Sequence, residues 1–156
     1  MFSLRALPAA LLDAIDKLAP DLVVCAGYMR IFSPAFVRHY SGRLLNIHPS
    51  LLPAYKGLDT HRRALEDGAT VHGCSVHYVT EELDGGPVVG QASVPVLPQD
   101  TAESLAERVH HAEHRLYPEV LGWYASGRLR MDGQVVFLDG APISHPVHRS
   151  YADATE

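Results

Sequence analysis

The sequence predicts an α/β layer fold, and two observations support this prediction. Short apolar runs with β-branched residues, which are typical of buried strands, alternate with segments whose apolar residues recur at helical spacing. Farther along the chain, two strand-like segments are separated only by a turn, which indicates an antiparallel pair. Strands that alternate with helices favour an α/β fold, in which ligands bind beyond the carboxyl ends of the strands.

Each element of the first half has a local reason. Leu11, Leu12 and Ile15 recur at helical spacing, so we expect an amphipathic helix there rather than a signal peptide. Ser33 is a good N-cap before a proline, and Gly68 can end a helix. The expected elements are a helix before Pro20, a strand over Leu22–Ala26, a helix over Pro34–Tyr40, a strand over Leu44–Ile47, and a helix over His61–Asp67 that Asp59 or Thr60 caps.

The second half contains the expected antiparallel pair. The turn Glu81–Gly86 separates its strands, and the prolines of the second strand favour an edge of the sheet. Asp100 and Glu103 resemble a capping box at the start of a long helix. The expected elements are strands over Gly73–Val79 and Pro87–Val96, a helix over Thr101–Tyr124, a hairpin of Leu129–Met131 and Val135–Leu138, and a loose tail from residue 141.

Composition and charge exclude several classes of protein. The 156 residues suffice for one domain, and 47% hydrophobic with 20% charged residues is ordinary for a globular chain. The net charge of −5 does not favour a nucleic-acid partner, and no apolar run reaches the roughly 20 residues of a membrane span. Cys25 and Cys74 form neither a disulfide framework nor a CxxC pair, so we expect a reducing, cytoplasmic environment.

Asn46, His48 and Asp84 are the residues best suited to chemistry. Asn46 and His48 are two positions apart at the end of a strand, so their side chains point to the same side. An amide can donate to a developing oxyanion, an imidazole can move a proton near pH 7, and Asp84 in a Gly-rich turn can orient the ring. This trio suits attack on a carbonyl-level carbon. On spacing alone, purely structural roles for all three stay open.

An ordered set of motifs resembles the folate-dependent formyltransferases. The run Asn46-Ile47-His48-Pro49-Ser50-Leu51-Leu52-Pro53, followed by Tyr55 and Gly57, is similar to the signature of that family. The resemblance covers about Pro20 to Gly140 and implies a three-layer, Rossmann-like fold with a mostly parallel sheet and an antiparallel part. The other matching segments are Ala26–Ile31, His72–Thr80, Leu83–Pro87, Glu113-His114, Tyr117-Pro118 and Gly127–Leu129.

The resemblance implies transfer of a formyl group from 10-formyltetrahydrofolate to the amine of glycinamide ribonucleotide, a step of purine biosynthesis, by direct attack and without a metal. His48 matches the general acid–base residue, Asn46 the amide that stabilises the oxyanion, and Asp84 the carboxylate that tunes His48. His110 and Glu113 match residues that contact the ribonucleotide. The residues that match the folate site are Met29, Arg30, Ile31, Phe32, Asn46, Thr80, Glu81, Glu82, Leu83 and Asp84.

Related activities and a metal site are the alternatives. The relatives that act on methionyl-tRNA carry a further C-terminal domain, and 10-formyltetrahydrofolate hydrolases usually have His where this chain has Pro49. Pro49 and the run Leu58–Arg62 therefore favour the branch that acts on glycinamide ribonucleotide. A hydrolase, or a folate-binding fragment without turnover, stays open. The segment His110–His114 also contains H-x-x-E-H, but no third zinc ligand is evident downstream, so we expect no metal.

The domain boundaries follow from the same resemblance. Family members begin with a strand and a Gly-rich loop that binds phosphate, and the motifs of this chain start after those elements. We therefore expect residues 1–140 to form a partial, N-terminally truncated catalytic domain, and residues 141–156 to form a C-terminal tail. A sheet edge without its partner strand favours self-association, so we also predict a homodimer.

Overall fold

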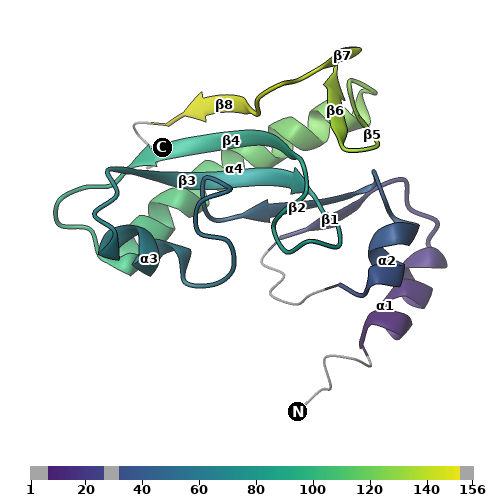
Figure 1. Ribbon diagram of the computed structural model, residues 1–156, viewed down its shortest axis with the longest axis horizontal. Coiled ribbons are helices and arrows are strands. Elements are labelled where there is room, and N and C mark those ends of the chain that lie inside the picture. The colour runs from purple at the N-terminus through teal and green to yellow at the C-terminus, as the bar shows by residue number, and fades with distance from the viewer. Residues whose placement is uncertain (1–6, 27–31, 152–156) are drawn as a thin grey trace.

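The computed structural model describes residues 7–26 and 32–151. Within these residues, the main sheet has five strands in the order β1-β2-β3-β4-β8 (Figure 1). β1 (Val23–Cys25) is parallel to β2 (Leu44–His48), and β8 (Val147–Ser150) is parallel to β4 (Val88–Pro95). β3 (Val71–Tyr78) lies between β2 and β4 and is antiparallel to both. The predicted α/β fold, with parallel strands and an antiparallel part, is confirmed.

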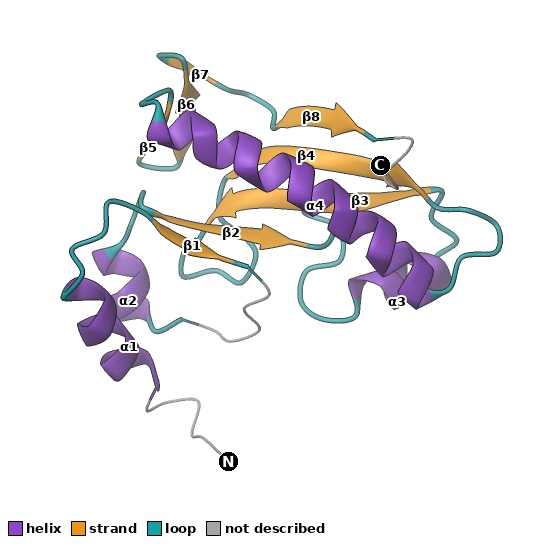
Figure 2. Ribbon diagram, turned by 180° about the vertical axis from the view of Figure 1, so that it is seen from behind, coloured by secondary structure: helices purple, strands orange, loops and turns teal. Residues whose placement is uncertain are grey.

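The helix α4 (Ala102–Ala125) covers one face of this sheet along most of its length (Figure 2). Its inward side chains recur every three or four positions, which places them on one stripe of the helix. They pack against the apolar side chains of β3 and β4 and so form the main core. Each fully buried Leu or Val contributes about 1.5–3 kcal/mol. The buried residues of α4 are Leu105, Val109, Ala112, Leu116, Tyr117, Val120 and Trp123.

A second, smaller core lies on the opposite face, under α1 (Leu7–Asp16) and α2 (Pro34–His39). Leu45 of β2 belongs to the core under α4, whereas its neighbour Leu44 packs with α2. Successive side chains of a strand point to opposite faces, so α2 and α4 cover opposite faces of β2. The sheet therefore lies between two helical layers. Ser33 accepts a hydrogen bond from the backbone N–H of Phe36 and caps α2 as predicted.

The remaining elements join the ends of the sheet. The helix α3 (Thr60–Glu66) follows the loop after β2 and packs against α4. Its N-cap is Asp59, which has a positive φ of 55° and makes no capping hydrogen bond through its side chain. The strands β5 (Leu129–Asp132) and β6 (Val135–Leu138) form the predicted hairpin, and β7 (Ala141–Pro142) extends it.

Three predictions about the second half are wrong. β4 is not an edge strand, because β8 pairs with it over Gly90–Ser93 and the prolines stand at its ends. For the same reason, the chain after residue 140 does not form a loose tail as far as Ser150. The long helix is capped by Thr101 with Ser104, one residue later than expected. Asp100 instead forms an ion pair with Arg108, with a shortest N–O distance of 2.6 Å.

No helix within the described ranges is both long enough and apolar enough to span a membrane.

Candidate active site

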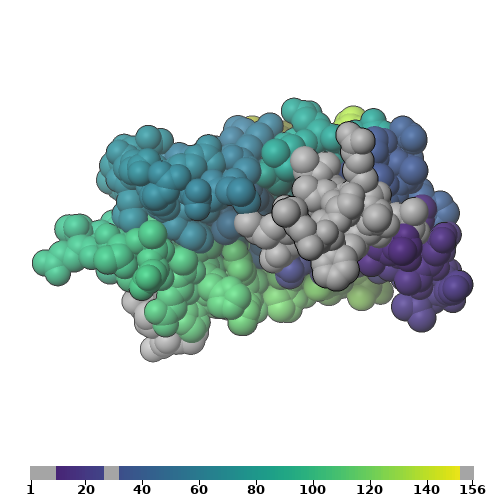
Figure 3. All heavy atoms as spheres, turned by 90° about the horizontal axis from the view of Figure 1, so that it is seen from below, coloured from purple at the N-terminus to yellow at the C-terminus, as the bar shows by residue number. Residues whose placement is uncertain are grey.

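A cavity of about 1030 Å³ lies at the carboxyl end of β2. Its walls come from β2, the loop Pro49–Asp59, the turn Thr80–Asp84 and one side of α4. In the space-filling view, the atoms of the loop and of α3 (blue) lie directly against those of α4 (green), at the end of the molecule opposite α1 (purple) (Figure 3). This volume is in the range of cavities that hold a small molecule or a cofactor.

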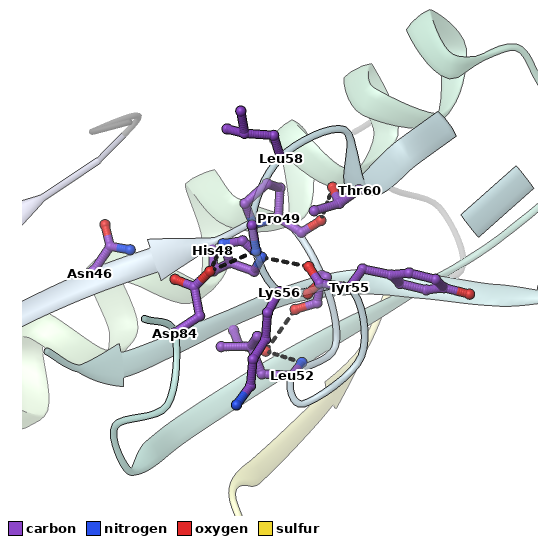
Figure 4. Close-up of polar contacts among 12 residues, drawn as sticks. Asn46, His48, Pro49, Leu52, Tyr55, Lys56, Leu58, Thr60 and Asp84 are labelled. Atoms are coloured by element: carbon purple, nitrogen blue, oxygen red, sulfur yellow. Dashed lines mark hydrogen bonds and ion pairs between the residues drawn. The ribbon is translucent and has the colours of Figure 1, made fainter. Parts of the chain in front are cut away.

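His48, the last residue of β2, lies in the cavity wall and is 6% exposed. Its Nε2 atom is 2.9 Å from the backbone carbonyl of Tyr55, and because a carbonyl can only accept, Nε2–H is the donor. Its Nδ1 atom faces the carboxylate of Asp84 at 3.5 Å. Figure 4 shows the ring between these two groups. Both ring nitrogens of His48 therefore face oxygen acceptors.

Asp84 reaches His48 from the turn between β3 and β4. The residue has a positive φ of 49°, a conformation that Asp tolerates better than most residues do. Its Oδ2 atom accepts a hydrogen bond of 2.9 Å from the backbone N–H of Gly57. The turn ends at Gly86, where a Cβ atom would lie 1.8 Å from the carbonyl oxygen of Tyr78, so only glycine fits. The side chain of Asp84 is thereby held in the cavity wall, and it is 10% exposed.

Asn46 is oriented by His77, its partner across the β2–β3 ladder. The Nδ1 atom of His77 is 3.0 Å from the carbonyl of Tyr78 and must donate to it. Burial lowers the pKa of His77, so its ring is neutral and its Nε2 atom accepts. The Nδ2 atom of Asn46 donates to that Nε2 atom over 3.3 Å. The Oδ1 atom of Asn46 is buried and has no hydrogen-bond partner among the described residues.

Glu113 lies on α4 and lines the side of the cavity that this helix forms. Burial raises the pKa of this carboxyl group, although a contact of 3.2 Å with the Nδ1 atom of His110 opposes the shift. His61, at the start of α3, also lines the cavity, and burial and the nearby His48 lower its pKa. Its Nδ1 atom is 3.1 Å from the Nε2 atom of His72. Buried titratable groups of this kind are typical of functional sites.

The structure brings most of the predicted site residues around this single cavity. His48, Asn46, Asp84, His110 and Glu113 all line it, although placement alone does not test their roles. Met29, Arg30 and Ile31 lie outside the described residues. The predicted folate-site residues that line the cavity are Phe32, Asn46, Thr80, Glu81, Glu82, Leu83 and Asp84. In the described part of the chain, no group of three or more His, Cys, Asp or Glu side chains is placed to hold a metal ion.

Sequence reasoning missed two kinds of participant. The carbonyl of Tyr55 and the amide of Gly57 are backbone groups, so the residue types at these positions do not indicate the contacts. The contact between His77 and Asn46 depends on the register of two antiparallel strands. The motif around His77 contained a histidine at the right place, but only the register shows which residue it orients.

Comparisons with known proteins identify the family of such a site. Residues 3–121 match the family model described as formyl transferase. The chain is 60% identical, over 130 residues, to the phosphoribosylglycinamide formyltransferase of Escherichia coli, and 48% identical to that of Haemophilus influenzae. These matches cover 83% and 84% of this chain but 61% and 62% of the two relatives. The chain thus spans about three fifths of their length.

A solved structure shows the same likeness in three dimensions. The phosphoribosylglycinamide formyltransferase of Coxiella burnetii superposes with a TM-score of 0.88 at 52% sequence identity. The match covers 96% of this chain and 71% of that one.

Proposed function

Because the chain belongs to the formyl transferase family, we propose that it transfers a formyl group from 10-formyltetrahydrofolate to the amine of glycinamide ribonucleotide. The relatives and the solved structure described above bear the name of that activity. The observation that supports the proposal best is the grouping of His48, Asn46 and Asp84 around one cavity. Each provides a function that acyl transfer needs: a proton shuttle, an oxyanion donor and a carboxylate that supports the cationic ring.

The bond changes of this reaction need only one acid–base residue. The amine nitrogen attacks the formyl carbon, a carbon–nitrogen bond forms, and the carbonyl oxygen becomes an oxyanion. When this tetrahedral intermediate collapses, the bond between the formyl carbon and N10 of the folate breaks. The attacking nitrogen loses one proton and N10 gains one. A single residue that accepts a proton and then returns it therefore balances the reaction.

His48 is the residue that we assign to this proton transfer. Its Nε2–H group is engaged by the carbonyl of Tyr55, which holds the ring in one orientation. Its contact with Asp84, at 3.5 Å, is longer than a strong charge-assisted hydrogen bond, so Nδ1 is the nitrogen left to exchange a proton. The carboxylate stabilises the imidazolium that forms when the ring accepts the proton of the amine.

Asn46 is the residue that we assign to the oxyanion. One N–H bond of Nδ2 is used by His77, which leaves the second for the oxygen on which negative charge develops. The Oδ1 atom, which has no hydrogen-bond partner among the described residues, can accept from an N–H group of the attacking amine. One amide can thus contact both reacting groups.

The two substrates divide the cavity between them. Glu113 and His110 on α4 offer a carboxylate and an imidazole to the amine and hydroxyl groups of the ribonucleotide. Apolar side chains such as Phe32, Val79 and Leu83, together with the backbone of the turn after β3, form a wall that suits the flat ring system of the folate. The same assignment predicts a cytoplasmic location, two small-molecule ligands and no nucleic-acid partner.

A product analysis tests this proposal. The chain is incubated with 10-formyltetrahydrofolate labelled in the formyl carbon and with glycinamide ribonucleotide, and the fate of the label is followed by carbon NMR. The proposal predicts that the label moves to the amide of formylglycinamide ribonucleotide. Release of the label only as formate would identify a hydrolase. Folate binding without any movement of the label would identify a binding fragment, and both outcomes contradict the proposal.

A further inference from the structure

The loop Pro49–Gly57 supplies the two backbone contacts that hold the catalytic pair. The carbonyl of Tyr55 accepts from His48, and the N–H of Gly57 donates to Asp84. These contacts come from one loop but reach two different elements, β2 and the turn after β3. The relative position of the His48 ring and the Asp84 carboxylate therefore depends on the conformation of this loop.

A buried hydroxyl group binds the middle of the loop to the sheet. Ser75 lies on β3 directly opposite His48 in the ladder and is 0% exposed. Its Oγ atom donates to the carbonyl of Ser50 over 2.7 Å and accepts from the N–H of Leu52 over 3.0 Å. Its remaining lone pair accepts from Gln91 over 3.0 Å, so every hydrogen-bonding capacity of the hydroxyl is used.

Gln91 adds a second attachment from the next strand. It faces Ser75 across the β3–β4 ladder, and His48, Ser75 and Gln91 form one row across three strands. Its Nε2 group donates to the carbonyl of Leu52 over 2.8 Å as well as to Ser75. Figure 4 shows dashed contacts at the backbone of Leu52, on the loop that carries Tyr55. Neither Ser75 nor Gln91 lines the cavity.

We propose that Ser75 and Gln91 are positioning residues for the reaction: through the loop Pro49–Gly57, they set the geometry of His48 against Asp84 without contacting substrate. This inference rests on the proposed function. A displacement of about 1 Å at a reacting group can lower a rate by about 100-fold, so loss of the attachment affects turnover. Because the cavity walls stay in place, it leaves substrate binding largely unchanged.

Steady-state kinetics of three variants test this inference. Ser75→Ala and Gln91→Met each remove the attachment, and we expect kcat to fall by about 10-fold to 100-fold while both KM values change by less than about 3-fold. The double variant loses no more than the larger of the two, since both residues act through the same loop. The matched control is Ser93→Ala, because Ser93 is also a buried serine in this sheet but contacts His148 of β8. Its kcat should equal that of the wild type.

A second readout separates this inference from the proposed function. Nitrogen NMR of the His48 ring, without substrate, reports the proton that Nε2 donates to Tyr55. We expect a slowly exchanging signal in the wild type and in Ser93→Ala, and a broadened or lost signal in Ser75→Ala and Gln91→Met. This NMR measurement tests the inference even if the wild type shows no turnover.

Three results would overturn it. They are an unchanged ring signal in both Ser75→Ala and Gln91→Met, a wild-type kcat in both of these variants, and an equal loss of kcat in Ser93→Ala. If Ser75→Ala does not fold, the inference is tested with Gln91→Met alone, because the side chain of Gln91 is only half-buried.

Discussion

The loop Pro49–Gly57 and the turn Thr80–Gly86 form two walls of the same cavity but are held in opposite ways. The loop is attached by buried hydrogen bonds to Ser75 and Gln91 on the sheet. The turn is attached by ion pairs at the surface, between Arg38 and Glu81 and between Lys56 and Glu82. In each pair, both side chains are more than a third exposed.

Because of this difference, the loop can position a catalytic side chain, whereas the turn can adapt to a ligand. Buried, fully satisfied hydrogen bonds are costly to break and unaffected by salt, so the loop gives the His48 ring one position. Exposed ion pairs contribute little and are screened by salt, so the turn can adjust to a ligand. Asp84 belongs to the adaptable wall, but its hydrogen bond to Gly57 ties its carboxylate to the rigid one.

Of these comparisons, the largest expected effect is on catalysis, at Asp84, where the turn contacts the loop. Asp84→Asn keeps an oxygen that can accept from Gly57 but removes the charge that faces His48. We expect kcat to fall by about 100-fold to 10,000-fold, the range that general acid–base catalysis contributes. The control is Asp59→Asn, another cavity-lining aspartate, which pairs with the exposed Arg62. Equal rates for the Asp84 variant and the wild type would refute the role of the pair.

The next effect is on stability, and it compares the two attachments directly. Ser75→Ala leaves the carbonyl of Ser50 and the N–H of Leu52 without their partner in the interior, so we expect a loss of about 1–3 kcal/mol in the free energy of unfolding. Glu81→Gln removes an exposed ion pair and should cost less than about 1 kcal/mol. Urea unfolding of both variants measures the difference. Similar losses would show that the loop is no more firmly held than the turn.

The rigid wall should also be sensitive to acid. Burial lowers the pKa of His72, whose ring contacts His61 and Tyr55, to about 4. In the unfolded chain, this pKa is about 6.5, so between pH 6.5 and pH 4 the unfolded state binds more protons and the fold loses stability as the pH falls. We expect the free energy of unfolding to be about 2 kcal/mol lower at pH 5 than at pH 7.

Substitution of this histidine tests the source of the acid sensitivity. His72→Gln should reduce the difference in unfolding free energy between pH 7 and pH 5. The matched variant His111→Gln, at an exposed position of α4, should leave it unchanged. A pH dependence that is the same in both variants would assign the effect to other groups.

The smallest effect is the response of the turn to salt. Raising the salt concentration from about 0.05 M to about 0.5 M shortens the Debye length to a few ångströms and weakens both surface ion pairs. We expect the KM for the folate to rise by less than about 3-fold, with kcat unchanged. The variant Glu82→Gln should show a smaller rise. A salt-dependent kcat would instead mean that the turn controls the position of Asp84.

The sequence predicted those parts of the molecule that depend on local chemistry. Ser33 before Pro34 predicted the start of α2, and the apolar runs predicted β1, β2 and the β3–β4 pair. The position of β8 could not be predicted, because Val147–Ser150 is short and its pairing with β4 depends on contacts more than fifty residues apart. The start of α4 was misplaced by one residue because Asp100 binds Arg108 instead of capping the helix.

The same distinction holds in the site. His48 and Asn46 could be paired from the sequence because they are neighbours on one strand. Asp84 was added as a carboxylate in a Gly-rich turn, and the motif resemblance then supported its place beside His48. The contacts that orient these residues could not be predicted. The carbonyl of Tyr55 and the N–H of Gly57 are available in every residue type, and the partnership of Asn46 with His77 requires the strand register.

The most direct test of the account compares His48→Ala with the wild type in a single assay of formylated glycinamide ribonucleotide. The folate affinity of both proteins is measured in parallel by titration calorimetry. We expect product formation by the variant to fall to the uncatalysed background while its Kd for the folate stays within about 3-fold of the wild-type value. Product formation by His48→Ala at the wild-type rate would contradict it.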